Sequence, residues 1–377
     1  MLSYISIAVS NRLFILVLFL LLFSCQTEIA TVSDDASIEI KLHGMVQDHS
    51  GLPIPGIQLS VDDQSITTDE EGRFELEGAP SAPVMIRLHG PQGIGQYVLE
   101  LEDTADAIDL TYPVVTKVVL LHDNDLHFNF NRQGDFKEKV KKFREKYENV
   151  WLLNAGDIFV RHSHRWAIED TSYYAETSLS MIDMMNEAEY DVAVAGNHEL
   201  DYVGDYTSLS LRSAEFPFLA ANIDAATTAL PHMKPFIVFE TQNGMSVAIL
   251  GLSTVNFEKP GVTARDPVET SLLYKNLAHE NDLFVTLNHI GITSDLDLAK
   301  ANPEIDIIVG GHSHTLLESA KLINGVLIAQ AGGPPPEHQV NPDWPKYLGK
   351  IKVTFHNDSI VEKTGRVVTI GTPVEVE

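Results

Sequence analysis

The sequence predicts an α/β domain preceded by a small all-β domain, and three observations support this division. From residue 114 onward, apolar runs rich in β-branched residues alternate with helix-like segments, as a sheet with crossover helices requires. Between residues 38 and 113 the apolar runs are short and alternating, and turn residues separate them. Polar residues typical of metal sites follow the apolar runs of the later part, where α/β proteins place their sites.

The first 25 residues have the pattern of an export signal. An apolar run of 11 residues (13–23) follows Arg12, which is shorter than a membrane-spanning helix and suits a signal peptide. The sequence LFSC at 22–25 is similar to a lipobox, so residues 1–24 are expected to be cleaved and Cys25 to be lipidated. The protein would then be an exported bacterial lipoprotein, anchored to a membrane on its periplasmic or cell-surface side. An uncleaved helix extending back to Ile5 is the alternative.

Residues 25–37 form a polar, acidic tether, and residues 38–113 predict a β-sandwich. The segment GMVQD at 44–48, the turn residues Gly51, Pro53 and Gly56, and TDEEGRF at 68–74 resemble a carboxypeptidase-regulatory-like, transthyretin-type domain. The segment contains no cluster of potential ligands. Its function as a spacer or docking module is an expectation from analogy.

Composition excludes some classes of partner. The formal charge of −27 argues against binding to a nucleic-acid duplex, which requires a basic face. The same charge repels anionic substrates at long range, so a phosphate would have to be attracted locally by metal ions. Cys25 is the only cysteine, which excludes an internal disulfide and a CxxC metal site.

The pattern of residues 114–377 predicts amphipathic helices between the strands. Apolar residues recur at helical spacing from Phe136 through Val140 and Phe143 to Tyr147. Further helices are expected near residues 172–188 and 294–301. The basic side chains of the first helix are expected to face solvent, with contact to anionic lipid as the alternative, and they are Lys137, Lys139, Lys141, Lys142, Arg144 and Lys146.

Short polar stretches follow the apolar runs of this domain, each at the predicted end of a buried strand. On a strand, residues two apart point to one side, so Asp125 and His127 are expected to reach a common ion. Carboxylate, amide and imidazole groups without a thiolate suit two borderline divalent ions, and Mn, Fe, Zn and Co are all possible. The stretches are DLH at 125–127, GD at 156–157, GNHE at 196–199, NH at 288–289 and GHSH at 311–314.

Three neighbouring residues have other interpretations. Asp123 has the same strand parity as Asp125, but we expect it to lie beyond the ligands or to face solvent. His198 has Asp201 three residues later, and if a helical turn begins there, Asp201 can accept from one ring nitrogen and orient the other toward substrate. Glu199 has no evident chemical role and is expected to be structural.

The order and spacing of these stretches resemble the calcineurin-like metallophosphoesterases over residues 115–356, most closely the 5'-nucleotidase and cyclic-phosphodiesterase branch. The resemblance implies a four-layer α/β (α+β) fold with two facing sheets flanked by helices. Many relatives continue into a C-terminal domain that binds the nucleoside, and we expect this chain to lack it. The resemblance also implies two metal ions, the first held by Asp125, His127, Asp157 and His314 and the second by Asp157, Asn197, His289 and His312.

The resemblance further implies a reaction. A hydroxide bridging the two ions would attack a phosphate ester, and His198 would stabilise the phosphoryl group or protonate the leaving oxygen. A phosphomonoesterase acting on nucleotides is the leading expectation. A phosphodiesterase acting on cyclic nucleotides or other diesters is the first alternative, and a non-catalytic binding lipoprotein on the same scaffold is the second. The intact set of ligands argues against the second.

Two departures from the family pattern bear on the substrate. Phe128 stands where glycine is usual and is expected to narrow the space beside the first ion. The segment IFVRHSHRW at 158–166 replaces a small, glycine-containing loop. Arg161 and Arg165 are expected to bind phosphate oxygens and Trp166 a base or sugar, although a solvated loop is an equal alternative. The stiff loop at 332–338 is expected to form one wall of the pocket.

Overall fold

The computed structural model describes residues 40–48, 51–61, 63–79, 84–90, 93–99, 107–112, 115–160, 171–201, 205–228, 230–255, 260–334, 343–356 and 359–372. The predicted signal peptide and tether, with Cys25, lie outside these residues, as does the segment 161–170. The chain separates into two compact units, Met1–Val115 and Thr116–Glu377. Within the described parts, no helix combines the length and the apolar character needed to cross a membrane.

The first unit is a small all-β sandwich, as predicted. Along one strand Phe74 and Leu76 are buried between exposed charged residues, and they pack with Leu59 and Leu88 of the other sheet in one core. The three-stranded sheet has the order β4 (Arg73–Ala79), β1 (Ile40–Gln47) and β7 (Ile108–Thr111). The four-stranded sheet has the order β3 (Gln64–Thr67), β2 (Gln58–Val61), β5 (Val84–Gly90) and β6 (Gly93–Leu99).

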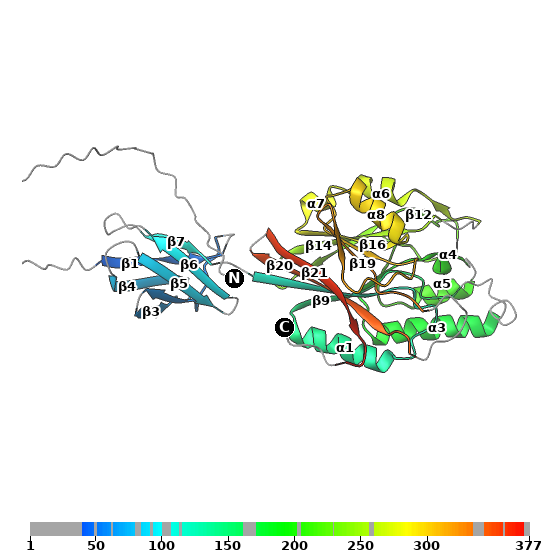
Figure 1. The fold of residues 1–377 in the computed structure, drawn as a ribbon, viewed down its shortest axis with the longest axis horizontal. Coiled ribbons are helices and arrows are strands. Elements are labelled where there is room, and N and C mark those ends of the chain that lie inside the picture. The colour runs from blue at the N-terminus through cyan, green and yellow to red at the C-terminus, as the bar shows by residue number, and fades with distance from the viewer. Residues whose placement is uncertain are drawn as a thin grey trace, which may run out of the picture. The chain divides into compact units, whose positions relative to one another are not determined.

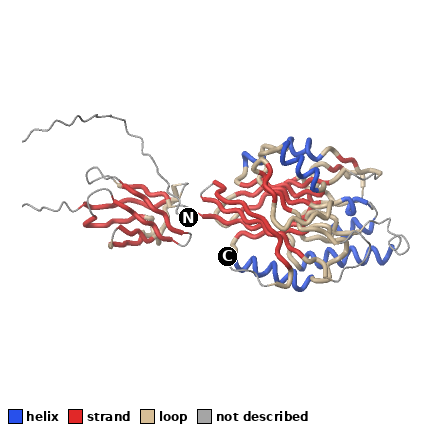
Figure 2. The backbone as a smooth tube through the Cα atoms, in the orientation of Figure 1, coloured by secondary structure: helices blue, strands red, loops and turns tan. Residues whose placement is uncertain are grey.

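The second unit contains two six-stranded sheets that face each other (Figures 1 and 2). The first sheet has the order β11 (Phe218–Leu219), β10 (Val192–Val194), β9 (Asn149–Asn154), β8 (Val115–Asp123), β20 (Tyr347–His356) and β21 (Ser359–Thr369). The second has the order β13 (Phe236–Glu240), β14 (Ser246–Ser253), β16 (Leu283–His289), β17 (Ile307–Gly310), β19 (Val326–Ala329) and β18 (Lys321–Ile323). A two-stranded ribbon is formed by β12 (Ile223–Asp224) and β15 (Thr263–Ala264).

Helices cover the outer face of each sheet, so the unit has four layers, as the resemblance implied (Figure 1). Between the sheets, Val118 and Leu120 of β8 pack with Val285 and Leu287 of β16 in a shared apolar core. The helices on the second sheet are α6 (Pro267–Leu273), α7 (Leu277–Glu280) and α8 (Ile292–Ala301). Those on the first sheet are α1 (Gln133–Lys146), α3 (Thr171–Glu187) and α5 (Asp205–Arg212).

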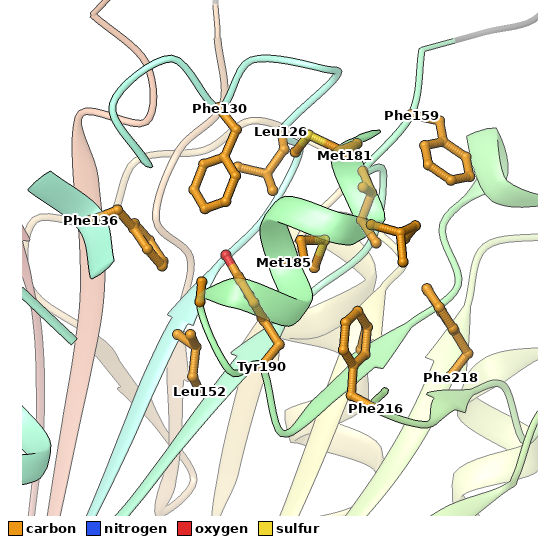
Figure 3. Packing of buried hydrophobic residues seen from close by; sticks show 14 of the residues in the cluster. Leu126, Phe130, Phe136, Leu152, Phe159, Met181, Met185, Tyr190, Phe216 and Phe218 are labelled. Atoms are coloured by element: carbon orange, nitrogen blue, oxygen red, sulfur yellow. The ribbon is translucent and has the colours of Figure 1, made fainter. Parts of the chain in front are cut away.

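Helix α1 buries the face that its periodicity predicts. Phe136, Val140 and Phe143 are buried, and Phe136 lies close to Tyr190 in the core beneath α3 (Figure 3). The prediction that all six basic side chains face solvent is wrong for Lys139, which is 3% exposed. Its ammonium group donates to the carbonyl oxygen of Thr372, because the chain returns along this helix after β21.

Parallel strands position the five polar stretches. Strands β8, β9 and β10 are parallel neighbours in one sheet, and β16 and β17 are parallel neighbours in the other. Each of these strands ends at or shortly before one of the stretches, as predicted. The second unit therefore brings residues from both sheets to the carboxyl ends of its strands, where α/β folds form their sites.

Candidate metal centre

The loops after β8 and β9 run side by side and place the first carboxylates. The backbone N–H of Asp125 donates to the backbone carbonyl oxygen of Gly156 (2.9 Å), and that of His127 donates to the backbone carbonyl oxygen of Asp157 (3.0 Å). Strand β8 has ended at Asp123, and Asp125 and His127 have positive φ angles of 54° and 47°. The prediction that they share one face of a strand is therefore wrong. Their side chains nevertheless converge, since His127 Nε2 lies 3.8 Å from Asp125 Oδ1.

His314 completes a group with Asp125 and His127. Its Nε2 atom lies 3.5 Å from Asp125 Oδ1 and 2.9 Å from His127 Nε2. The Nδ1 atoms of the two histidines face the carbonyl oxygens of Phe159 (3.0 Å) and Pro334 (2.9 Å). A carbonyl oxygen only accepts, so each Nδ1 carries the proton and, in neutral rings, each Nε2 presents a lone pair. Two lone pairs this close repel unless a metal cation or a shared proton lies between them.

A second group forms around Asp157. His289 Nε2 lies 3.1 Å from Asp157 Oδ2, and His312 Nδ1 lies 3.3 Å from His289 Nε2. The Nδ1 atom of His289 faces the carbonyl oxygen of Ala155 at 2.7 Å. Asn197, the first residue of α4 (Asn197–Asp201), has a buried side-chain oxygen that lacks a hydrogen-bond partner among the described residues. An unsatisfied buried acceptor costs about 1–3 kcal/mol, which a cation would offset.

Asp157 lies between the two groups. Its Oδ2 atom is 3.1 Å from His289 Nε2 and 3.9 Å from His127 Nε2, while Oδ1 accepts from the backbone N–H of His198 (3.0 Å). The resemblance implied that Asp157 binds both ions, and in this geometry its Oδ2 atom faces both groups. The histidines and aspartates lie in three groups suited to a metal ion, namely Asp125/His127/His314, His127/Asp157/His198 and Asp157/His289/His312. The donor set fits two divalent ions.

The charges of these buried side chains are strongly coupled. Burial raises the pKa of Asp125 to about 6. Burial opposes the ionisation of Asp157, but His289 and His198 hold its pKa well below the usual range. Burial lowers the pKa of His289, yet the Asp157 carboxylate outweighs this and raises it to about 10. Without metal, Asp157 and protonated His289 therefore form a buried ion pair, and a bound cation has to replace that proton.

Glu199 clamps the backbone of two ligand loops. Its Oε2 atom accepts from the N–H groups of Asp157 (2.9 Å) and Gly196 (2.7 Å), and Oε1 accepts from Ile158 (2.9 Å) and Phe159 (3.0 Å). The side chain is fully buried. Asp157 has a φ of 54°, a conformation that costs about 1–3 kcal/mol and persists only when its surroundings impose it. The hydrogen bonds give Glu199 the structural role that the sequence left unspecified.

Sequence reasoning missed the contribution of Asn124, although its place directly before Asp125 was a signal. Its amide nitrogen donates to Asp125 Oδ2 and to the carbonyl oxygen of Gly332, and its oxygen accepts from Ala331 (2.9 Å). Asn124 thus ties the ligand Asp125 to the end of β19. The described part of the predicted wall loop, 332–334, therefore supports ligands: Pro334 fixes the ring of His314.

Asp123 is buried beyond the ligands and does not face solvent. Its carboxylate accepts from the hydroxyl of Tyr190 and from Asn154 Nδ2 (2.9 Å), while Asn154 Oδ1 accepts from the N–H of Gly156 (2.9 Å). Gly156 has a φ of 84°, and a Cβ atom there would lie 2.6 Å from the ring of His289. A larger residue would therefore displace a predicted ligand.

His198 lies on the short helix α4, with Nε2 3.6 Å from Asp157 Oδ2. The helical turn that was predicted to begin here is present, but the side chain of Asp201 lies outside the described parts of the structure. Arg161, Arg165 and Trp166 lie outside them as well. The ring of Phe128 contacts the rings of Phe159 and Tyr174, with centroids 5.6 and 5.5 Å away, and so belongs to the apolar cluster beside the site.

Comparisons with known proteins show which proteins the chain resembles. The calcineurin-like phosphoesterase family matches residues 118–316. A trifunctional nucleotide phosphoesterase of Bacillus subtilis is 26% identical over 72% of this chain and 20% of its own length. A 5'-nucleotidase of Vibrio cholerae is 27% identical over 71% of this chain and 54% of its own. The structure of a 5'-nucleotidase precursor from Thermus thermophilus is similar with a TM-score of 0.54 and 25% identity, over 67% of this chain and 54% of that one. The chain thus spans about half or less of these relatives.

Glu199→Gln should destabilise the second unit. An amide offers one oxygen and an NH₂ group, and the NH₂ group would face backbone N–H donors. We expect a loss of about 1–3 kcal/mol in the free energy of unfolding, measured with urea. Glu145→Gln is the matched control, because Glu145 is exposed and pairs only loosely with Lys141 (3.9 Å); its effect should stay below about 0.5 kcal/mol. Equal stabilities of the two variants would contradict the clamp.

Proposed function

The chain belongs to the calcineurin-like phosphoesterase family, and we propose that it is an exported enzyme that hydrolyses phosphate esters with two bound divalent metal ions. The observation that carries this proposal is the close approach of His127 Nε2 and His314 Nε2, 2.9 Å apart beside Asp125. Lone pairs held together in this way suit a cation-binding site. They serve no purpose in a core stabilised by hydrogen bonds alone.

We assign the ligands as the resemblance implied. When bound, the ions supply Lewis acidity, which stabilises charge on phosphoryl oxygens and lowers the pKa of water. The backbone carbonyl groups of Phe159, Ala155 and Pro334 hold three histidines in the tautomer that offers Nε2. One ion takes Asp125, His127, Asp157 and His314, and the other takes Asp157, Asn197, His289 and His312. Mn, Zn, Fe and Co all accept this set of oxygen and nitrogen donors.

We propose that His198 acts on the substrate and not as a ligand. Its backbone N–H donates to Asp157 Oδ1, which fixes the start of α4 against the centre. The imidazole can then donate a proton to the leaving oxygen of the ester, with Asp201 orienting the ring. The alternative is that His198 binds a metal ion, because it forms one of the groups suited to an ion together with His127 and Asp157. The test of this assignment must therefore include metal content.

We propose a nucleotide monoester as the substrate. The relatives named 5'-nucleotidase support this choice. A diester such as a cyclic nucleotide is the second candidate, because the name of another relative, a trifunctional nucleotide phosphoesterase, does not restrict the ester to a monoester. A screen of phosphate release from nucleotides, sugar phosphates and cyclic phosphates with added Mn²⁺ decides between them. Two bound ions without hydrolysis of any of these would instead indicate a non-catalytic binding protein.

Activity should depend strictly on metal. Chelation should abolish phosphate release, and Mn²⁺ or Zn²⁺ should restore it, because the described residues of the centre offer no covalent nucleophile that would act alone. Asp157→Asn should lower kcat more than Asn197→Ala does, since Asp157 lies toward both groups, whereas Asn197 is assigned to one ion. Full activity in protein shown by elemental analysis to be metal-free would refute the proposed mechanism.

His198→Ala should lower kcat about 10²–10⁴-fold, the usual contribution of a general acid. Metal content should stay at two ions per chain. A nitrophenolate leaving group needs little protonation and should recover part of the loss. His279→Ala is the matched control, because His279 is exposed and pairs with Glu304 (3.6 Å). Loss of an ion from the His198 variant would make this residue a ligand.

We propose that Arg161, Arg165 and Trp166 contact the substrate beyond its phosphate. The segment begins shortly after Val160, whose carbonyl oxygen accepts from the hydroxyl of Tyr174 (3.1 Å), so its base is fixed near the centre. Replacing both arginines with alanine should raise KM for anionic substrates more than it lowers kcat, as expected for lost uniform binding. An unchanged KM for every hydrolysed phosphate would remove this segment from substrate recognition.

We also propose that residues 1–24 are a signal peptide and that Cys25 carries a lipid anchor followed by the tether 25–37. Cys25→Ala should release the protein from the membrane fraction without changing the hydrolytic rate of purified protein. Mass spectrometry of the wild-type N-terminal peptide should show an acylated cysteine. Retention of the variant after a salt wash would support an uncleaved helix instead.

A further inference from the structure

We propose that Asp295 is a positioning residue for the metal-binding histidines of the second sheet, and that it acts through Asn288 and Gln330. The proposal rests on the proposed function, because it assigns the purpose of this buried carboxylate to the same centre. Asp295 lies on α8, outside the five polar stretches, and among the described residues it forms no hydrogen bond or ion pair with a predicted ligand.

The carboxylate joins the ends of two strands. Its Oδ1 atom accepts from Asn288 Nδ2 (2.9 Å), and Asn288 directly precedes the predicted ligand His289 at the end of β16. Its Oδ2 atom accepts from Gln330 Nε2 (2.8 Å), which directly follows β19. One buried side chain on α8 thus fixes β16 and β19 relative to each other, on either side of β17.

From Gln330 the network continues to the loop that carries two further histidines. Ser313 Oγ donates to Gln330 Oε1 (3.0 Å), and it also accepts from the N–H of Ile292 (3.1 Å) and lies 2.9 Å from Thr315 Oγ1. Ser313 stands between the predicted ligands His312 and His314. A continuous path of side-chain hydrogen bonds therefore links Asp295 to the neighbours of three ligands.

The cost of this arrangement argues for a purpose beyond packing. Asp295 is fully buried, and burial raises the pKa of its carboxyl group to about 7, against the effect of its two amide donors. Among the described residues no lysine or arginine forms an ion pair with it, and the charge of His289 offsets only part of the effect of burial on its pKa. Gly310 leaves room for the carboxylate and its partner, since a Cβ atom there would clash with Asp295 Oδ2 and would lie 2.6 Å from Gln330 Nε2. Apolar residues such as Leu298 and Ile308 already pack α8 against the sheet, so the fold does not need a charge here.

Binding of Co²⁺ tests the proposal without reference to hydrolysis. The variants are Asp295→Ala, Ser313→Ala and their double mutant, and their dissociation constants are measured by competition with a chelator. Loss of a supporting hydrogen bond typically weakens metal binding about 10–100-fold, so each single variant should lose about tenfold. The double mutant should lose no more than the larger single loss, because both changes interrupt one path. The visible absorption of bound Co²⁺ should change in all three.

Two further variants separate positioning from general stability. Asp295→Asn keeps the shape and should recover most of the affinity, because the amide of Asn288 can turn its unpartnered oxygen toward the new donor. Asp297→Ala is the matched control: Asp297 lies on the same helix, exposed and paired with Lys300 (3.0 Å), and the variant should bind Co²⁺ as the wild type does. If Asp295→Ala fails to fold, the Co²⁺ affinity of Ser313→Ala tests the proposal, because Ser313 is exposed and its replacement should not disturb the core.

Wild-type Co²⁺ affinity and spectrum in Ser313→Ala would overturn the proposal, as would additive losses in the double mutant. Failure of this proposal can be distinguished from failure of the proposed function. If the wild-type protein binds two Co²⁺ ions but releases no phosphate from any tested ester, the proposed hydrolytic activity is refuted and the positioning role of Asp295 is not affected. Normal hydrolysis with unaltered metal binding in every variant would support the proposed enzyme activity and refute the positioning role of Asp295.

Discussion

The structure depends on one electrostatic constraint: several buried groups that can only accept cations or protons are held with their lone pairs facing one another. His127 and His314 approach within 2.9 Å, and the side-chain oxygen of Asn197 is buried without a hydrogen-bond partner among the described residues. Such an arrangement is unfavourable in an empty apolar core. The surrounding fold therefore has to hold these side chains against their mutual repulsion, and bound divalent ions would relieve it.

Holding these side chains in place requires an unfavourable backbone conformation. Five predicted ligands, Asp125, His127, Asp157, His312 and His314, have positive φ angles, which non-glycine residues rarely adopt. The loops are stable in this conformation because buried side chains satisfy their N–H groups. Glu199 accepts four backbone hydrogen bonds beneath Asp157, and Asn124 ties the first loop to the end of β19.

The two sheets solve the same problem with similar chemistry. Beneath the first sheet's loops, Asp123 and Glu199 are buried carboxylates that accept hydrogen bonds from their neighbours. Beneath the second sheet's loops, Asp295 has the corresponding place and accepts from two amides. A buried carboxylate offers two strong acceptors in a fixed plane, so it can orient several donors at once. The loops that carry the predicted ligands thus rest on buried acidic residues that are not themselves predicted ligands.

The sequence by itself determined the fold class, the helix α1 and the strand ends that carry the polar stretches, because periodicity and turn residues act over a few neighbouring positions. Only the tertiary structure decided how the stretches meet. His127 and His314 are 187 positions apart, and the carbonyl groups that fix their tautomers come from other loops. The burial of Lys139, the clamp formed by Glu199 and the network of Asp295 were equally hidden. A side chain's hydrogen-bond partners are set by three-dimensional packing, and no local pattern in the chain encodes residues that are distant in sequence.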